Sequence, residues 1–95
     1  MRNLYIPYLG KKPATLKING HNLLILSEDH VQLEDGMDLV GADRLKKIST
    51  FSDEQESIEL DQLAKRIHGG IVVAPDDVDL DSVITGLKTQ LPWIQ

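Results

Sequence analysis

The residues of this sequence best able to do chemistry are four carboxylates, in two pairs that lie far apart in the chain. Glu28 and Asp29 follow the apolar segment 21–26, and Asp76 and Asp77 follow the apolar segment 71–74. If both segments are parallel strands of one sheet, their carboxyl ends meet at one edge, where open α/β sheets collect ligands. Because hard cations need only a few carboxylate oxygens and water, these residues are candidate magnesium ligands. The competing interpretation, which the sequence favours, is that they are solvated acids in the first turns of helices.

No other pattern supports catalysis or a cofactor. The segment Asp77-Val-Asp79-Leu-Asp81 resembles the opening of a calcium loop, but Ser82 replaces the glycine and Lys88 replaces the bidentate glutamate. The three histidines are dispersed, no nucleophile elbow or zinc-protease motif occurs, and the absence of cysteine excludes thiolate chemistry and disulfides. We therefore expect a non-catalytic protein without a cofactor.

Length and charge narrow the classes of partner. The 95 residues predict a single domain spanning 1–95. The formal net charge is −5, and the basic clusters Lys11-Lys12 and Arg44-Leu-Lys46-Lys47 are short. Because phosphate backbones are bound by clustered Lys and Arg, we expect no nucleic-acid binding. No apolar run has the length of a membrane span or of an export signal, so we expect no membrane association and a cytoplasmic location.

Some large apolar side chains have no evident place in a core. The segment 3–9 is predicted to be an edge strand, because Pro7 lacks an N–H group. Ile58 falls on the polar side of its predicted helix. Tyr and Trp side chains suit partner contacts, although the Trp near the C-terminus can also close a thin core. The candidate partner-binding residues are Tyr5, Tyr8, Ile58, Trp93 and Ile94.

The element that the sequence predicts most sharply is a β-hairpin. Asn19-Gly20 lies between two apolar segments, and a type I′ turn needs φ > 0 at both central residues, which Asn and Gly tolerate best. The turn sets a register in which Ile18 faces His21, Leu16 faces Leu23 and Ala14 faces Ile25. Segment 21–26 is apolar on both faces, which predicts a strand covered on both sides.

Three helices are predicted after the hairpin. The first is capped by Ser27 and stops at Gly41, and segment 44–50 after it is either a strand or the tail of that helix. The second begins at a Ser52–Gln55 capping box and ends near Gly69. The third is capped by Asp79 or Asp81. Their apolar stripes are Leu60, Leu63, Ala64 and Ile67 in the second helix, and Leu80, Val83, Ile84, Leu87 and Leu91 in the third.

Together these elements predict an α/β fold. We expect a small mixed sheet with an N-terminal antiparallel hairpin extended by parallel strands, about five strands and three helices, and helices on both faces. The apolar strand 70–74 is placed beside 21–26, with 44–50 outside it. The function expected is that of a small acidic protein–protein interaction or regulatory accessory module that acts through a partner or as a homodimer. The alternative is a magnesium-dependent or small-ligand-binding domain that uses the acidic carboxyl edge of the sheet.

Overall fold

The computed structural model describes residues 2–90, which form six strands and four helices. The strands are β1 (Arg2–Leu9), β2 (Lys12–Pro13), β3 (Leu16–Ile18), β4 (His21–Leu26), β5 (Arg44–Thr50) and β6 (Gly70–Val73). The helices are α1 (His30–Asp35), α2 (Met37–Val40), α3 (Asp53–Ile67) and α4 (Leu80–Gln90). The predicted α/β class is confirmed, whereas the predicted counts of five strands and three helices are wrong.

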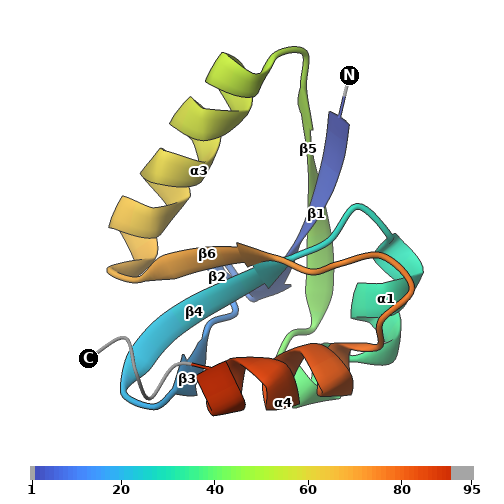
Figure 1. Cartoon of the computed structure of the whole chain (residues 1–95). Helices are drawn as coiled ribbons and strands as arrows, with labels where there is room; N and C mark the ends of the chain where they lie inside the picture. Colours follow the sequence, from blue (N-terminus) through green and yellow to red (C-terminus); the bar gives the residue numbers. More distant parts are fainter. Residues whose placement is uncertain (1, 91–95) are drawn as a thin grey trace.

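The strands form two sheets rather than one. The first has the order β2-β1-β5 and the second the order β3-β4-β6. Strands β1 and β5 run across the direction of β4 and β6 (Figure 1). The sheets touch where Tyr5 and Ser27 exchange backbone hydrogen bonds of 2.7 and 3.2 Å. Strand β5 pairs with β1 and not with β6, so the strands form two crossing sheets in place of the predicted single sheet.

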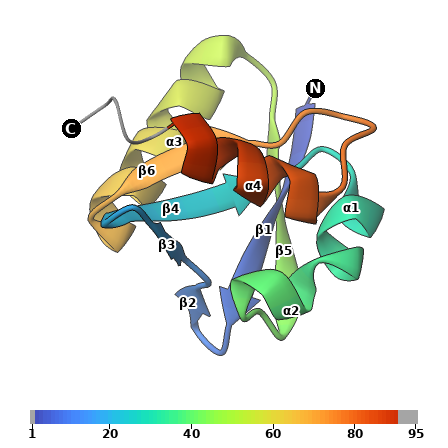
Figure 2. The same ribbon diagram turned by 60° about the horizontal axis from the view of Figure 1, so that its bottom comes forward.

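Strand β4 lies at the centre of the core, as its two apolar faces predict. Leu23 and Ile25 pack in one buried cluster with residues of α1 and α4. Leu24 and Leu26 pack on the opposite side with β1 and α3. Helices α3 and α4 therefore cover opposite faces of the β4–β6 sheet (Figures 1 and 2). The predicted parallel pairing of β4 with β6 is confirmed, with Leu24 opposite Ile71.

The predicted hairpin is confirmed except at its open end. Asn19 and Gly20 have φ of 51° and 85°, as a type I′ turn requires. Leu16 pairs with Leu23, and Ile18 pairs with His21. The expected pairing of Ala14 with Ile25 is not made, since β3 begins at Leu16 and the Ala14 amide donates to the Pro7 carbonyl at 2.9 Å. Ala14 therefore belongs with the first sheet, and the chain passes to the second sheet between Ala14 and Leu16.

The prediction that segment 3–9 is an edge strand is wrong, because β1 lies between β2 and β5. The backbone N–H and C=O groups of successive residues in a strand point alternately to the strands on its two sides. The Tyr8 carbonyl accepts from Asp43 on the β5 side, whereas the Tyr5 and Pro7 carbonyls accept from Ser27 and Ala14 on the other side. The missing N–H of Pro7 therefore lies away from β5, and the long β1–β5 ladder loses no hydrogen bond.

The placement of segment 44–50 beside 70–74 is also wrong. Segment 44–50 is strand β5, and it pairs along its whole length with β1, from Arg44 opposite Tyr8 to Thr50 opposite Arg2. Strand β6 consequently has one partner, β4, and lies at the outside of its sheet. Strand β6, without charged residues, is thus an edge strand, whereas the prediction gave it neighbours on both sides.

Candidate functional site

Two surface features of residues 2–90 are candidates for function: an acidic pocket and the outer edge of β6. The acidic pocket has a volume of about 450 Å³ and lies between α1 and the segment that leads into α4. Five of its lining residues are aspartates, and apolar side chains complete its wall. The lining residues are Asp29, Val31, Gln32, Asp35, Gly36, Leu39, Asp77, Val78, Asp79, Leu80 and Asp81.

Helix caps position two of these aspartates. Asp29 caps α1, since one of its carboxylate oxygens accepts from the Val31 amide at 2.9 Å. Asp79 caps α4 in the same way and accepts from the Ser82 amide at 2.8 Å. The hydroxyl and the backbone N–H of Ser82 donate to this carboxylate and lower the pKa of Asp79 below its usual value. Each of these two aspartates therefore uses one carboxylate oxygen in a backbone hydrogen bond while its side chain lines the pocket.

A buried glutamine holds the two walls of the pocket together. The Gln32 amide nitrogen donates to the Pro75 carbonyl at 2.9 Å and also to the Val78 carbonyl. The hydroxyl of Ser27, which is fully buried, donates to the Gln32 amide oxygen. This network joins the end of β4, helix α1 and the loop before α4. Sequence reasoning missed Gln32, because four of the six residues of α1 are polar and no local pattern marks this one as buried.

The structure places the predicted magnesium ligands in different surroundings. Asp29 and Asp77 line the acidic pocket, Asp76 is exposed outside it, and Glu28 binds Arg2. Among residues 2–90, no group of three or more His, Cys, Asp or Glu side chains is close enough to hold a metal ion. The pocket therefore offers dispersed negative charge rather than a formed coordination shell.

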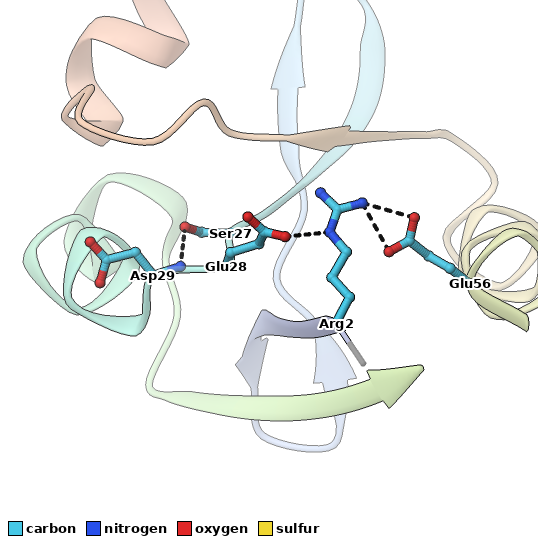
Figure 3. Close-up of polar contacts among 5 residues, drawn as sticks. All are labelled: Arg2, Ser27, Glu28, Asp29 and Glu56. Atoms are coloured by element: carbon cyan, nitrogen blue, oxygen red, sulfur yellow. Dashed lines mark hydrogen bonds and ion pairs between the residues drawn. The ribbon is translucent and has the colours of Figure 1, made fainter. Parts of the chain in front are cut away.

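Glu28 belongs to a bridge between three elements (Figure 3). The Arg2 guanidinium at the start of β1 binds Glu28 after β4, and it also binds both carboxylate oxygens of Glu56 on α3 at 2.9 Å. The hydrogen bond and charge of Glu28 raise the pKa of Arg2 further above its usual value. Ser27 accepts from the Asp29 amide at 2.9 Å beside this bridge. Glu28 is thus a structural ion-pair partner in this arrangement.

Three of the predicted partner-binding residues lie within residues 2–90, and their surroundings differ. Tyr8 is 3% exposed and packs in the cluster with α3. Tyr5 packs against the cluster on the α4 side, with its ring centroid 5.4 Å from that of His30. Ile58 on α3 is 53% exposed. Trp93 and Ile94 lie outside the described residues, so their predicted role in partner contact is not addressed by the structure.

The outer edge of β6 is the second candidate. The Ala74 amide donates to the Leu26 carbonyl at 2.7 Å, so the backbone groups of Ala74 point toward β4. Backbone groups alternate in direction along a strand, so those of Val72, two residues earlier, also point toward β4. The N–H and C=O groups of Ile71 and Val73 therefore point outward. Beside this edge is an apolar groove of about 340 Å³, shared between β6, α4 and their connection. It is lined by Val72, Val73, Pro75, Val78, Ser82, Val83, Gly86 and Leu87.

The other outer strands of the described sheets carry features that discourage pairing. Strand β5 has Arg44, Lys46 and Lys47, and charged side chains, Lys above all, are a common protection of sheet edges. Strand β3 has three residues with Lys17 at its centre, and β2 has only two residues. Strand β6 has the sequence Gly-Ile-Val-Val, without charge or proline. Its edge is therefore the least protected among the strands of residues 2–90.

Comparison of the chain with protein-family models, with curated proteins and with solved structures found no match. Within residues 2–90, no helix has the length and apolar character needed to cross a membrane.

Proposed function

We propose that the protein is a small, non-catalytic interaction module that pairs the outer edge of β6 with the same edge of a second copy. The observation that carries the proposal is the position of an uncharged apolar strand at a sheet edge, beside an apolar groove. Unpaired backbone groups on such an edge recruit another strand. Pairing about a two-fold axis presents the same patch on both copies, as closed dimers require.

The register of this dimer follows from the direction of the backbone groups. With the axis at Val72, each Ile71 exchanges backbone hydrogen bonds with Val73 of the second copy, because both residues point outward. The Val72 side chains then face each other as a close pair, and the two grooves beside α4 are brought together. The resulting sheet is continuous across the axis.

Proline at position 73 tests this register. Val73→Pro removes an outward N–H but no hydrogen bond to β4, so the fold is retained while the edge is blocked. We expect the wild-type protein to sediment as a concentration-dependent dimer. The proline variant should associate at least about tenfold more weakly, since two lost hydrogen bonds contribute about 1 kcal/mol each.

Val73→Ala is the matched control, because it loses side-chain packing but keeps the N–H. Sedimentation equilibrium of all three proteins, with circular dichroism to verify folding, decides the proposal. A wild-type protein that stays monomeric at millimolar concentration contradicts it, as does a proline variant that dimerises as well as the alanine variant.

A second candidate function is the binding of a small cationic ligand or magnesium in the acidic pocket. The observation that favours it is the presence of five aspartates around a single pocket of about 450 Å³. Hard cations are bound by carboxylate oxygens with water completing the shell. Titration with magnesium chloride should shift the amide signals of Asp29 and Asp77, and Asp35→Asn should weaken the shifts. The absence of shifts at 10-fold excess metal over protein rules out this candidate, whatever the oligomeric state.

A further inference from the structure

The structure brings together basic side chains that are far apart in the sequence. Lys11 lies in the turn before β2 and Lys12 is the first residue of β2, whereas Arg66 lies in the last turn of α3 and His68 is its C-cap residue. They surround a depression of about 570 Å³ whose other lining residues are Pro13, Thr15 and Ile67. Every titratable side chain in this lining is basic, although the chain has 15 acidic residues and 10 Lys and Arg. We refer to this depression as the basic pocket.

The positive charge of the basic pocket is not compensated within the described part of the chain. Arg2, Arg44 and Lys65 each bind a carboxylate. Lys11, Lys12, Arg66 and His68 form no ion pair among residues 2–90. An uncompensated group of cations in a concave site focuses the electrostatic potential on an incoming anion.

Arg66 is held in place by neutral groups. One guanidinium nitrogen donates to the Tyr8 hydroxyl at 3.5 Å, and the other donates to the Lys11 carbonyl at 3.4 Å. These long contacts orient the side chain without neutralising it. A guanidinium offers several donors in a planar fork, so Arg66 can still present a pair of N–H groups to an anionic oxygen. Arg66 thus links the end of α3 to the turn before β2.

Further cations lie next to the basic pocket. A neighbouring pocket of about 270 Å³ also includes Arg66 and adds Lys46 and Lys47, with Glu59 as its acidic lining residue. The Lys46 ammonium lies 4.5 Å from the centre of the Tyr8 ring. The two basic clusters that look short and separate in the sequence are therefore joined through Arg66 and Tyr8.

The end of a helix ordinarily disfavours anions, because its free carbonyls carry partial negative charge. Here three of the last four carbonyls of α3 accept hydrogen bonds. Lys65 and Ala64 accept from the His68 and Gly69 amides at 3.3 and 3.1 Å. The Ile67 carbonyl accepts from the Asn22 side chain at 3.1 Å. Most helix carbonyls at this end are therefore already hydrogen-bonded, and the charged side chains that line the pocket beside them are basic.

We propose that the basic pocket binds a small ligand carrying an oligophosphate group. Several cations around one depression match a ligand that concentrates several negative charges in a small volume, and the Arg66 fork matches two phosphate oxygens. The volume lies within the range of small-molecule sites. A nucleic-acid backbone needs an extended basic stripe, whereas these cations surround a single depression. The basic pocket shares no lining residue with the groove beside β6, so ligand binding can be tested independently of dimerisation.

Titration with sodium tripolyphosphate in 150 mM NaCl, followed by amide NMR and calorimetry, tests the site. We expect a dissociation constant of about 100 µM or lower, with shifts concentrated at residues 11–15 and 66–69. Arg66→Gln should weaken binding at least tenfold, and Lys12→Gln should weaken it severalfold. Lys17→Gln removes one positive charge from outside the pocket lining and is the matched control, for which binding should change less than twofold. Thermal melting verifies that each variant is folded.

Four further ligands, namely ADP, ATP, citrate and a short oligonucleotide, identify the chemistry that the site recognises. Tighter binding of ADP or ATP than of tripolyphosphate assigns the site to a nucleotide, whereas equal binding assigns it to the phosphate chain alone, and both support the proposal. Citrate, which presents carboxylates in place of phosphates, should bind at least tenfold more weakly. The proposal is overturned if citrate binds as well as tripolyphosphate, if a short oligonucleotide binds more tightly than either, or if Arg66→Gln behaves as Lys17→Gln does.

Discussion

Individual glycines in this chain have roles that their sequence context does not reveal. The helix that became α3 was predicted to end near Gly69, and glycine is the usual left-handed residue after a helix, but His68 adopts that conformation with φ of 53°. Gly69 instead lies against β4, where a Cβ atom would come within 2.1 Å of the Asn22 carbonyl oxygen. The requirement at position 69 is therefore space for a neighbouring backbone.

Two glycine-to-alanine changes should have opposite effects for this reason. Gly69→Ala must displace backbone and should destabilise the protein by about 2–3 kcal/mol, as overpacking does. Gly86 lies in α4 with nothing within 4 Å of a Cβ atom, so Gly86→Ala should stabilise by about 1 kcal/mol through helix propensity. Urea unfolding of both variants measures the two free energies. Equal effects of the same sign would contradict the assignment of Gly69.

The Asp79 cap predicts a pH dependence. Its pKa is lowered by hydrogen bonds from Ser82, so the carboxylate stabilises the folded state above its unfolded pKa of about 3.9. This contribution is lost as the pH falls through the lower folded-state pKa. Asp79→Ala should melt below the wild-type protein at pH 7, and the difference should shrink between pH 4 and pH 2. Asp81→Ala removes the same charge without the cap hydrogen bond and serves as the control.

At the scale of elements, the hairpin is the unit that local chemistry explains most fully. Both turn residues have positive φ, and β-branched residues strongly resist that conformation. Gly20→Val should therefore destabilise the protein by about 2–3 kcal/mol. Thermal or urea unfolding measures the loss, with Lys17→Val as a control at an exposed strand position where valine is favoured. An unchanged unfolding midpoint for Gly20→Val would show that the turn does not set the register.

The predicted start of α3 is confirmed, whereas the first predicted helix is changed by contact with a neighbouring helix. Ser52 caps α3 by accepting from the Gln55 amide at 3.1 Å, as predicted. The first predicted helix, by contrast, is divided into α1 and α2 at Gly36, and Asp29 rather than Ser27 caps it. Leu80 at the start of α4 packs so closely on Gly36 that a Cβ atom would lie 2.3 Å from it. The break is thus set by packing between helices.

At the scale of the whole molecule, the distribution of charge over the surface says more about which ligands can bind than the net charge does. Acidic side chains surround the pocket beside α1, while the basic pocket lies at the end of α3. With a net charge of −5 and only short basic clusters, arbitrary duplex or single-stranded nucleic acid should bind negligibly at physiological salt. A mobility-shift assay at 150 mM salt measures this. Tight, salt-sensitive binding would contradict it, and Lys11, Lys12, Lys46 and Lys47 would be the residues to replace.

The sequence by itself determined the elements whose causes are local. Positive φ at Asn19-Gly20 specified the hairpin, the Ser52 cap and the stripe ending at Ile67 specified α3, and the two apolar faces of 21–26 specified a covered central strand. Each depends on residues within a few positions of one another, so turn geometry, capping and periodicity suffice to predict it. Of the four carboxylates expected at one sheet edge, Asp29 and Asp77 line the same pocket, whereas Asp76 lies outside it and Glu28 binds Arg2.

Only the tertiary structure decided which strands pair over long distances. Nothing in segment 44–50 specifies β1 rather than β6 as its neighbour, because backbone hydrogen bonds are the same for every sequence and the side-chain pattern suits either edge. That one choice moved Pro7 into a central strand, left the apolar β6 at an edge and divided the sheet in two. The meeting of Lys11 with Arg66 across 55 positions likewise depends on chain closure, which no local pattern encodes.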